Sequence, residues 1–234
     1  MVMHATLPSR EALTALDTQL TSQTPQAIVR WAIDHYFPNL ALTCSFGGSS
    51  GMVLLDIALK IEPNLPVLVL DTGLLFSETY ALVEQIEKHY GITVQYSRPR
   101  QTVAEQAATH GPELWGNNPD LCCKLRKVEP LKDVLAPYDA WLTALRRDQS
   151  STRANTPVVS WNEKHQLVKI CPLALWTERD IWRYIHANGV PYNPLLDQGY
   201  TSLGCHTCTS HPVNGDPRSG RWAGFNKTEC GLHI

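Results

Sequence analysis

The chain has 234 residues, of which 43% are apolar and 18% charged, and its formal net charge is −2. This composition excludes a disordered chain, a collagen-like chain and a coiled coil, and a chain of this length can bury one sizeable core. The small negative charge argues against binding to bulk nucleic acid. We therefore expect one main domain, with a smaller appendage at most.

No segment predicts a membrane span or a secretion signal. The longest strongly apolar stretch, 52–59, is interrupted by Asp56 and is too short to cross a bilayer. The N-terminus lacks a charged region followed by an apolar run, so no signal peptide is expected. The seven cysteines cannot all pair within one chain. The reducing cytoplasm is therefore the expected compartment, and clustered cysteines there indicate a metal or catalysis more often than disulfides.

The first 38 residues predict a helical segment. Ser9 can cap a helix from residue 10 to about residue 20. Thr24 followed by Pro25 is typical of the start of a second helix, because proline is favoured at the first helical position. Residues 1–38 are therefore expected to form N-terminal helices.

From residue 39 on, short apolar runs alternate with helical segments, which is typical of an α/β fold. Such runs predict a parallel sheet with helices on both faces, and ligands bind beyond the carboxyl ends of its strands. This α/β domain is expected over 39–203, followed by a loop-rich mobile tail of the same domain over 204–234. The expected strands are 40–44, 66–70, 92–96 and 140–145, and the clearest helices start near 51 or cover 77–90 and about 178–187.

The loop after the first expected strand reads Ser-Phe-Gly-Gly-Ser-Ser-Gly over 45–51. Its glycines would let the backbone approach a phosphate, and a helix N-terminus favours negative charge. It is not a Walker A loop, because no Gly-Lys-Ser/Thr follows. A plain strand-to-helix turn is the alternative. The candidate ligands are Ser45, Gly47, Gly48 and Ser49.

Polar residues also follow the second and fourth expected strands. Asp71, Thr72 and Gly73 could hold a ribose or an adenine amino group, although an ordinary helix cap would use the same residues. The fourth strand leads into a basic segment whose arginine forks suit phosphate and sulfate oxygens. An anionic small molecule or a merely solvated loop would explain that charge. The arginines are Arg146, Arg147 and Arg153.

Two pairs of cysteines, Cys122 with Cys123 and Cys205 with Cys208, could together complete an all-cysteine site for zinc or for an iron–sulfur cluster. Adjacent cysteines suit tetrahedral zinc poorly, because its ligands are usually two to four residues apart, whereas a cluster offers several irons. We therefore favour a cluster. Structural zinc, buried free cysteines and a redox pair at Cys205 and Cys208 are the alternatives.

A seventh thiol, Cys230, lies four residues from the chain end. An unperturbed thiol has a pKa of roughly 8.5 and is only slightly ionised at neutral pH. Nearby cations would raise the thiolate fraction, and the candidates are Arg218, Arg221, Lys227 and His233. The remaining cysteines, Cys44 and Cys171, are expected in the core.

In this order along the chain, the motifs resemble the assimilatory adenylylsulfate reductases, within the wider phosphoadenylylsulfate reductase family. The matching residues run through most of the chain from Ser45 onward. They are Leu70-Asp71-Thr72-Gly73, Cys122-Cys123, Arg126 to Leu131, Arg146 to Ser150, Pro191-Tyr192-Asn193, Gly204-Cys205 with Cys208, Gly220-Arg221-Trp222 and Glu229 to His233.

The resemblance implies an adenine nucleotide α-hydrolase-like (Rossmann-like) fold and an enzyme of assimilatory sulfate reduction and cysteine biosynthesis. It implies a [4Fe–4S] cluster on Cys122, Cys123, Cys205 and Cys208, with Cys230 as the nucleophile that takes up the sulfonate. Thioredoxin would then release sulfite. With the nucleotide held by the loops after the strands, the expected anion ligands are Lys127, Arg146, Arg147, Arg153, Arg218, Arg221 and His233.

The preferred substrate is expected to be adenylylsulfate, because members of the family that use phosphoadenylylsulfate usually lack the four cluster cysteines. One departure works against this preference. Similar adenylylsulfate reductases carry an acidic pair late in the first loop, where this chain has Ser49 and Ser50. More distant alternatives are an ATP pyrophosphatase-type adenylating enzyme and a non-enzymatic module with a four-cysteine zinc site.

Overall fold

The computed structural model describes residues 9–213 and 216–233. The expectations for residues 1–8, 214–215 and 234 therefore lie outside the described residues. Within the described ranges, no helix has both the length and the apolar character that a membrane span requires. The helices are α1 (Arg10–Thr21), α2 (Pro25–Tyr36), α3 (Ser49–Ile61), α4 (Ser77–Tyr90), α5 (Val103–His110), α6 (Leu114–Asn117), α7 (Pro119–Cys123), α8 (Glu129–Leu135) and α9 (Glu178–Asn188), and the strands are β1 (Leu40–Thr43), β2 (Val67–Leu70), β3 (Gln95–Ser97), β4 (Ala140–Leu142), β5 (Val159–Asn162) and β6 (Leu167–Ile170).

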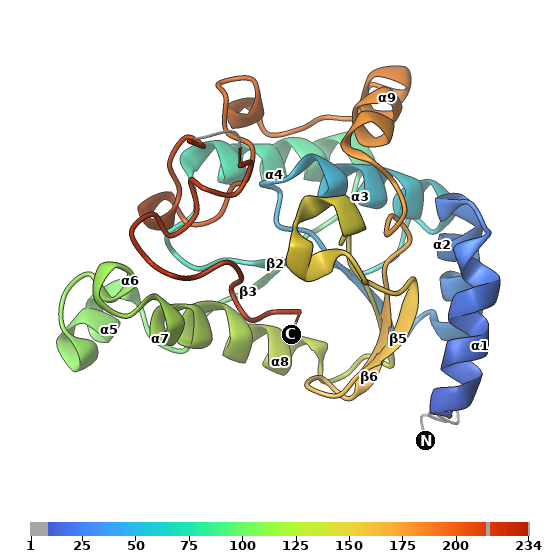
Figure 1. Ribbon diagram of the computed structural model, residues 1–234, viewed down its shortest axis with the longest axis horizontal. Coiled ribbons are helices and arrows are strands. Elements are labelled where there is room, and N and C mark those ends of the chain that lie inside the picture. Colours follow the sequence, from blue (N-terminus) through green and yellow to red (C-terminus); the bar gives the residue numbers. More distant parts are fainter. Residues whose placement is uncertain (1–8, 214–215, 234) are drawn as a thin grey trace.

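The strands form one six-stranded sheet in the order β3-β2-β1-β4-β6-β5 (Figure 1). Neighbouring strands are parallel except β5 and β6, which pair antiparallel. The expected α/β fold is confirmed, and β5 is the strand of this sheet that departs from the parallel direction. Neither β5 nor β6 is among the expected strands, because Ser160 and Lys169 interrupt their short apolar runs.

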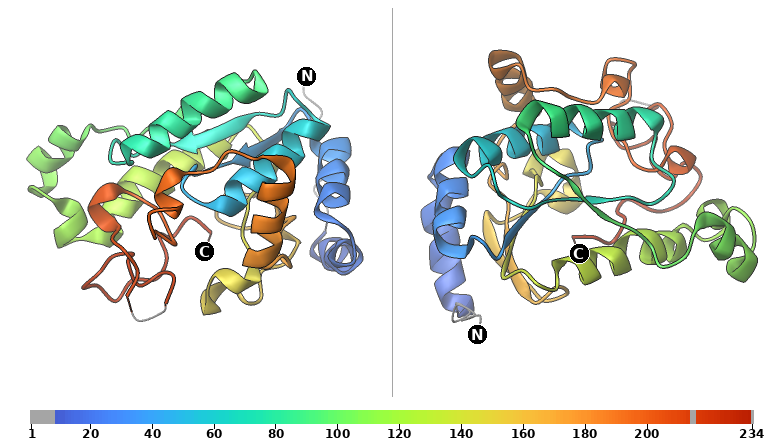
Figure 2. Two further views of the ribbon diagram at one scale, coloured as in Figure 1. Left: turned by 90° about the horizontal axis from the view of Figure 1, so that it is seen from above. Right: turned by 180° about the vertical axis from the view of Figure 1, so that it is seen from behind.

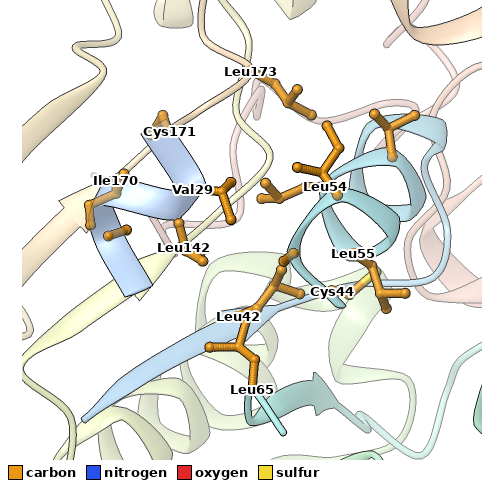
Figure 3. Close-up of a cluster of buried hydrophobic side chains, with 14 of the residues drawn as sticks. Val29, Leu42, Cys44, Leu54, Leu55, Leu65, Leu142, Ile170, Cys171 and Leu173 are labelled. Carbon is orange, nitrogen blue, oxygen red and sulfur yellow. The ribbon is translucent and has the colours of Figure 1, made fainter. Parts of the chain in front are cut away.

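Helices cover both faces of the sheet, as expected. Along β1, Leu40 and Leu42 enter the larger hydrophobic core with α2, α3 and α4, whereas Ala41 enters a smaller core with α8. Leu40 and Leu42 are separated from Ala41 in this way because successive side chains of a strand point to opposite faces of the sheet. In β4, Trp141 likewise belongs to the smaller core with α8. The close-up in Figure 3 shows the larger core between the sheet and the helices α2 and α3.

Capping side chains start α1 and α2 where the sequence predicts them. The side chain of Ser9 accepts a hydrogen bond from Ala12 at the start of α1, and Thr24 does the same for Ala27 at the start of α2. The expected strand 92–96 is shifted to β3 (Gln95–Ser97). The cause is Glu87 of α4, which accepts hydrogen bonds from the backbone N–H groups of Ile92 and Val94.

The two cysteines assigned to the core are confirmed there. Cys44 is 2% exposed and Cys171 is fully buried. Burial raises the pKa of each thiol to about 12, so both stay protonated. They are thus set apart from the five cysteines that the sequence assigns to chemistry.

A buried acid joins three helices on one side of the sheet. Asp56 of α3 is 3% exposed and accepts hydrogen bonds from the hydroxyls of Tyr90 (2.8 Å) and Tyr184 (2.7 Å), and Lys60 lies 2.8 Å from its carboxylate. Burial and the bonds to Asp56 raise the pKa of both tyrosines. This carboxylate therefore links α3 to α4 and α9.

We expect Asp56→Ala to lower the free energy of unfolding by about 2–4 kcal/mol, because it leaves two half-buried hydroxyls without their acceptor and Lys60 without its ion-pair partner. Urea unfolding measures the change. Asp34→Ala, which removes an exposed acid from α2, is the matched control and should shift stability by less than about 0.5 kcal/mol. A loss for Asp56→Ala as small as the control's would contradict the structural role.

Candidate functional site

A cavity of about 620 Å³ opens beyond the carboxyl ends of β1, β2 and β4, where the sequence predicts a site. Its walls come from the loops after these strands, from the start of α9 and from the C-terminal segment. Figure 2 shows that segment, in red, running back into the middle of the molecule. The predicted site residues that line the cavity are Ser45, Gly47, Gly48, Ser49, Thr72, Lys127, Arg146, Arg153, Arg218, Arg221, Cys230 and His233.

The glycine-rich loop ends at the N-terminus of α3. Gly48 is the capping residue, and Ser49 and Ser50 begin the helix, both nearly buried. A Cβ atom at Gly47 would lie 3.0 Å from the Cβ of Leu203, so the side chain of Leu203 leaves little room for a residue larger than glycine at position 47. The loop presents backbone and hydroxyl groups at an electropositive helix end, which suits a phosphate.

Of the three residues after β2, only Thr72 lines the cavity. The carboxylate of Asp71 instead accepts hydrogen bonds from Tyr80 (2.7 Å), Arg98 (3.0 Å) and the backbone of Gly73 (2.9 Å). Burial opposes ionisation of Asp71, but these bonds outweigh it and lower its pKa. Asp71 and Gly73 therefore shape the turn that presents Thr72 and lie outside the cavity wall.

Of the three predicted arginines after β4, Arg146 and Arg153 line the cavity and Arg147 does not. Arg147 lies outside the cavity wall, because its Nε donates to the carbonyl of Thr156 at 2.8 Å. Arg146 is 3% exposed and pairs with Glu178 of α9 and with Asp148, 3.1 Å away. Its Nη1 is buried without a hydrogen-bond partner in the described structure. That nitrogen is a free donor for a ligand.

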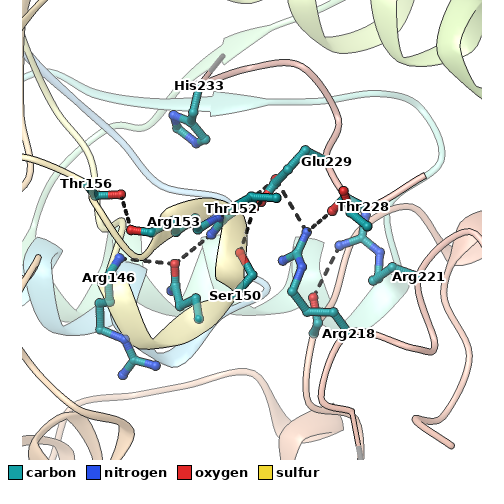
Figure 4. A network of polar contacts seen from close by, with 12 residues as sticks. Arg146, Ser150, Thr152, Arg153, Thr156, Arg218, Arg221, Thr228, Glu229 and His233 are labelled. Atoms are coloured by element: carbon teal, nitrogen blue, oxygen red, sulfur yellow. Dashed lines mark hydrogen bonds and ion pairs between the residues drawn. The ribbon is translucent and has the colours of Figure 1, made fainter. Parts of the chain in front are cut away.

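The C-terminal segment 216–233 is docked against the cavity (Figure 4). Glu229 pairs with Arg153 and Arg218. The ring of His233 stacks on Trp141, with centroids 5.1 Å apart. Burial, followed by the charge of Arg153, lowers the pKa of His233 well below its usual value. This shift favours the neutral ring of His233, and its role as a substrate-binding residue stays a prediction.

Two other cations lie at the cavity without a carboxylate partner among the described residues. Lys127 borders Cys230 and Cys205, whose negative charges outweigh the burial of its ammonium and raise its pKa. The guanidinium of Arg221 stacks over Trp222 at 4.4 Å and donates to the carbonyl of Leu203 at 3.2 Å. Its Nε is buried and free. Lys127 and Arg221 thus bring positive charge to the cavity.

The two cysteine pairs gather beside these cations. Cys122 and Cys123 end α7, and Cys205 precedes a short 3₁₀ turn that ends at Cys208. The first three are each 6% exposed, and the seven cysteines are free thiols. Burial, then the charges of the other three thiols, raises the pKa of Cys122 to about 11. The structure therefore brings the four predicted ligands together.

The donor set fits a multi-iron cluster better than a single ion. Within the described residues, no three His, Cys, Asp or Glu side chains converge closely enough to hold one metal ion. A zinc ion needs its sulfur ligands at about 2.3 Å, whereas a [4Fe–4S] cluster takes one thiolate on each iron. The four thiols lie next to Arg126 and Lys127, and Cys122, Cys123 and Cys205 are buried whereas Cys208 is half-buried. They suit that requirement of separate thiolates and nearby positive charge.

Three acids that line the cavity, Asp148, Glu178 and Glu229, are not among the predicted site residues. Glu178 lies at the start of α9, where its Oε1 is 3.5 Å from the Oγ of Ser49 and accepts from Trp182 at 2.8 Å. Glu229 holds the C-terminal segment. The position of Glu229 immediately before Cys230 is a usable signal, whereas nothing in the sequence around Glu178 points to the loop at Ser49.

Comparison with known proteins gives consistent matches. A family model, the phosphoadenosine phosphosulfate reductase domain, matches residues 39–211. The adenosine 5'-phosphosulfate reductase 2 of Bacillus subtilis is 47% identical over 222 residues, which cover 93% of this chain and 94% of that protein. A phosphoadenylyl-sulfate reductase from Candida auris has a similar structure, with a TM-score of 0.78, 35% identity and coverage of 88% of this chain and 100% of that chain. The Candida glabrata FMN adenylyltransferase, with a TM-score of 0.58, 16% identity and coverage of 87% and 65%, shares the fold alone.

We expect Gly204→Ala to weaken binding of ADP, which carries two adjacent anionic groups, by about tenfold. An added Cβ would overlap the guanidinium of Arg221 and push it out of the cavity wall. Titration calorimetry measures the affinity. Gly116→Ala, where a Cβ meets nothing within 4 Å, is the matched control. Equal ADP affinity in both variants would show that Arg221 does not contact a bound anion.

Proposed function

Since the chain belongs to the phosphoadenosine phosphosulfate reductase family, we propose that it reduces adenosine 5'-phosphosulfate to sulfite and AMP in assimilatory sulfate reduction. The observation that carries this proposal is the position of Cys230 beside Lys127 in a cavity at the strand ends of an adenine nucleotide α-hydrolase fold. The relatives' names support the adenylylsulfate substrate, and the reductase matches leave the adenylating and zinc-module alternatives without support.

In this proposal the nucleotide lies along the strand ends. The N-terminus of α3 and the loop before it bind the phosphate, and Thr72 borders the nucleotide. The free Nη1 of Arg146 and the free Nε of Arg221 supply unsatisfied buried donors for oxyanions. Lys127 lies close enough to Cys230 to neutralise the sulfate as the thiolate approaches, which like charges would otherwise oppose.

The first chemical step is nucleophilic substitution at sulfur. The electron pair of the Cys230 thiolate forms a sulfur–sulfur bond, and the bond from sulfur to the phosphate oxygen breaks. AMP leaves with that electron pair, and the enzyme carries a Cys230 S-sulfonate. Lys127 and Arg221 would stabilise the negative charge that gathers on the oxygens in this step.

The second step requires a dithiol reductant, and thioredoxin is the proposed partner. A thioredoxin thiolate attacks the Sγ of Cys230, sulfite leaves with the bonding electron pair, and a mixed disulfide forms. The second thioredoxin thiol resolves that disulfide and restores Cys230. A reducing cytoplasm is the proposed compartment, because it keeps all seven thiols free.

The proposed cofactor is a [4Fe–4S] cluster held by Cys122, Cys123, Cys205 and Cys208, and when bound it supplies a compact centre of structure and charge beside Lys127. Thiol chemistry alone accounts for the two electrons of the reaction. Arg126 supports this region, since its Nε donates to the Thr72 carbonyl at 2.6 Å and its Nη1 to Gln106 at 3.0 Å.

Glu178 supports the choice of adenylylsulfate over its 3'-phosphorylated form. The first loop itself carries hydroxyls at Ser49 and Ser50 in place of acids. The carboxylate of Glu178 nevertheless lies 3.5 Å from Ser49. Because Arg146 is shared between Glu178 and Asp148, these three side chains together keep one net negative charge at this end of the cavity. It would repel an additional phosphate there.

We expect anaerobically purified protein, supplied with thioredoxin, to release sulfite from adenylylsulfate at least about tenfold faster than from phosphoadenylylsulfate. Sulfite assays with each substrate measure the rates. Cys230→Ser should lower the rate at least about 1,000-fold, because the nucleophile is lost. Cys171→Ala, which removes a thiol outside the cavity, is the control. No sulfite from either substrate would refute the proposed function, and faster release from phosphoadenylylsulfate would refute the substrate.

We expect Cys123→Ser to lose iron and turnover together, because a cluster that lacks one thiolate is not retained. Iron content and visible absorbance report the cluster, and Cys230→Ser should keep both. Zinc in place of iron in the unaltered protein would refute the cluster. Full sulfite release by an iron-free variant would remove it from the mechanism.

A further inference from the structure

Glu229 is bound by two arginines that both line the cavity. Its Oε1 accepts from the Nε of Arg153 at 2.8 Å and its Oε2 from the Nη2 at 2.7 Å, a two-point ion pair. The Nη2 of Arg218 lies 3.5 Å from the same Oε2 and donates to the carbonyl of Thr228 at 2.8 Å. Thr152 adds a hydrogen bond at 3.2 Å (Figure 4). We call Glu229, Arg153 and Arg218 the Glu229 anchor.

The anchor is charged and largely enclosed. The side chain of Glu229 is 10% exposed, and those of Arg153 and Arg218 are 15% and 18% exposed. Burial opposes ionisation of Glu229, but the hydrogen bonds and charge of Arg153, then the charge of Arg218, outweigh it and lower its pKa. Two-point pairs of this kind are among the stronger polar contacts in proteins.

The arginine side of the anchor is itself fixed to the domain. The Nη1 of Arg153 donates to Gln149 at 2.6 Å, and Gln149 in turn accepts from the backbone of Arg146. Through Arg153, Glu229 is therefore attached to the hydrogen-bonded turns that follow β4. The chain on its other side is held separately, because Lys164 and Lys169 donate to the carbonyls of Gly231 and His233.

Cys230 lies between these two attachments. Residues 231–233 are fixed by backbone hydrogen bonds and by the stacking of His233 on Trp141. On the preceding side, Glu229 makes the nearest side-chain contacts. The next attachment before Glu229 is at Lys227, which pairs with Asp120. Loss of the anchor would thus free the chain between Lys227 and Cys230 while the last residues stay attached, and the thiol would no longer have one position over the cavity.

The anchor also separates the cavity's cations into two groups. Arg153 and Arg218 already carry the carboxylate of Glu229, whereas no carboxylate pairs with Lys127 or Arg221 among residues 9–213 and 216–233. An incoming anion binds more favourably at an unpaired cation, since it displaces no existing partner.

We propose that Glu229 is a positioning residue, which sets Cys230 over the cavity through Arg153 and Arg218. This inference rests on the proposed function, because it assigns Cys230 as the nucleophile. It gives Arg153 and Arg218 a role in holding the C-terminal segment.

The test compares Glu229→Gln, Arg153→Gln and the double variant in the iron-loaded enzyme. Without nucleotide, we expect iodoacetamide to alkylate Cys230 about tenfold faster in each variant, as followed by mass spectrometry of the C-terminal peptide. Because removal of an acid next to Cys230 could also alter its ionisation, the alkylation rate is measured across pH. A change in positioning raises the plateau rate, whereas altered ionisation only shifts the profile.

With saturating adenylylsulfate, each variant should form the S-sulfonate about tenfold more slowly, while its dissociation constant for AMP stays within about twofold. The double variant should be no worse than either single variant, because both remove the same contact. Glu84→Gln, which neutralises an exposed acid on α4, is the control for net charge and should change none of these quantities.

The opposite pattern would overturn the inference. If Glu229 does not position Cys230, Glu229→Gln and Arg153→Gln each leave the rate of S-sulfonate formation at the level of the unaltered protein. An unchanged plateau of alkylation would also refute the anchor. The alkylation measurement needs no turnover, so it remains decisive even if the unaltered protein releases no sulfite and the proposed function fails.

Discussion

Electrostatic repulsion is the constraint on which the rest of this structure depends. The site gathers a thiol nucleophile and four further thiols in and beside one cavity, and in the proposed reaction it also receives an anionic nucleotide, so that all of these carry or develop negative charge. Cations must therefore be held there at low exposure, where each is worth more than in water. They come from three separate segments of the chain, and they are Arg126 and Lys127, Arg146 and Arg153, and Arg218 and Arg221.

A local change in helix geometry helps to place two of these cations. Between α7 and α8 the chain widens into a π-helical turn over Lys124–Val128, and Pro130 follows in the first turn of α8. Proline cannot donate a backbone hydrogen bond and clashes with the preceding turn, so the regular helical ladder is interrupted here. The wider turn carries Arg126 and Lys127, immediately after Cys122 and Cys123. Cysteine ligands and cations are thus adjacent because of one irregularity in the backbone.

The sequence predicts the sheet's central strands and the position of the site, because both follow from apolar runs and from the loops that end them. What it cannot predict is which polar groups are already satisfied. Asp71 looks like a nucleotide ligand, but Tyr80 and Arg98 take up its carboxylate. Lys169 interrupts the apolar run of β6, so the sequence does not predict this strand. The side chain of Lys169 is nevertheless buried, because it donates to a carbonyl of the C-terminal segment. These partners lie far apart in the chain, so only the folded structure reveals them.

The C-terminal segment has to meet two opposed requirements. In the first step of the proposed mechanism Cys230 must be fixed over the cavity and shielded from solvent, and in the second it must be accessible to a protein reductant. A hydrophobic attachment as extensive as the core would satisfy only the first. The segment instead buries few apolar groups, namely Trp222, Leu232 and the ring of His233, and the rest of its attachment is polar. Polar contacts at a cavity mouth can be exchanged for water when the segment leaves, at a small net cost for each bond. Docking and release can therefore alternate without disturbance of the sheet.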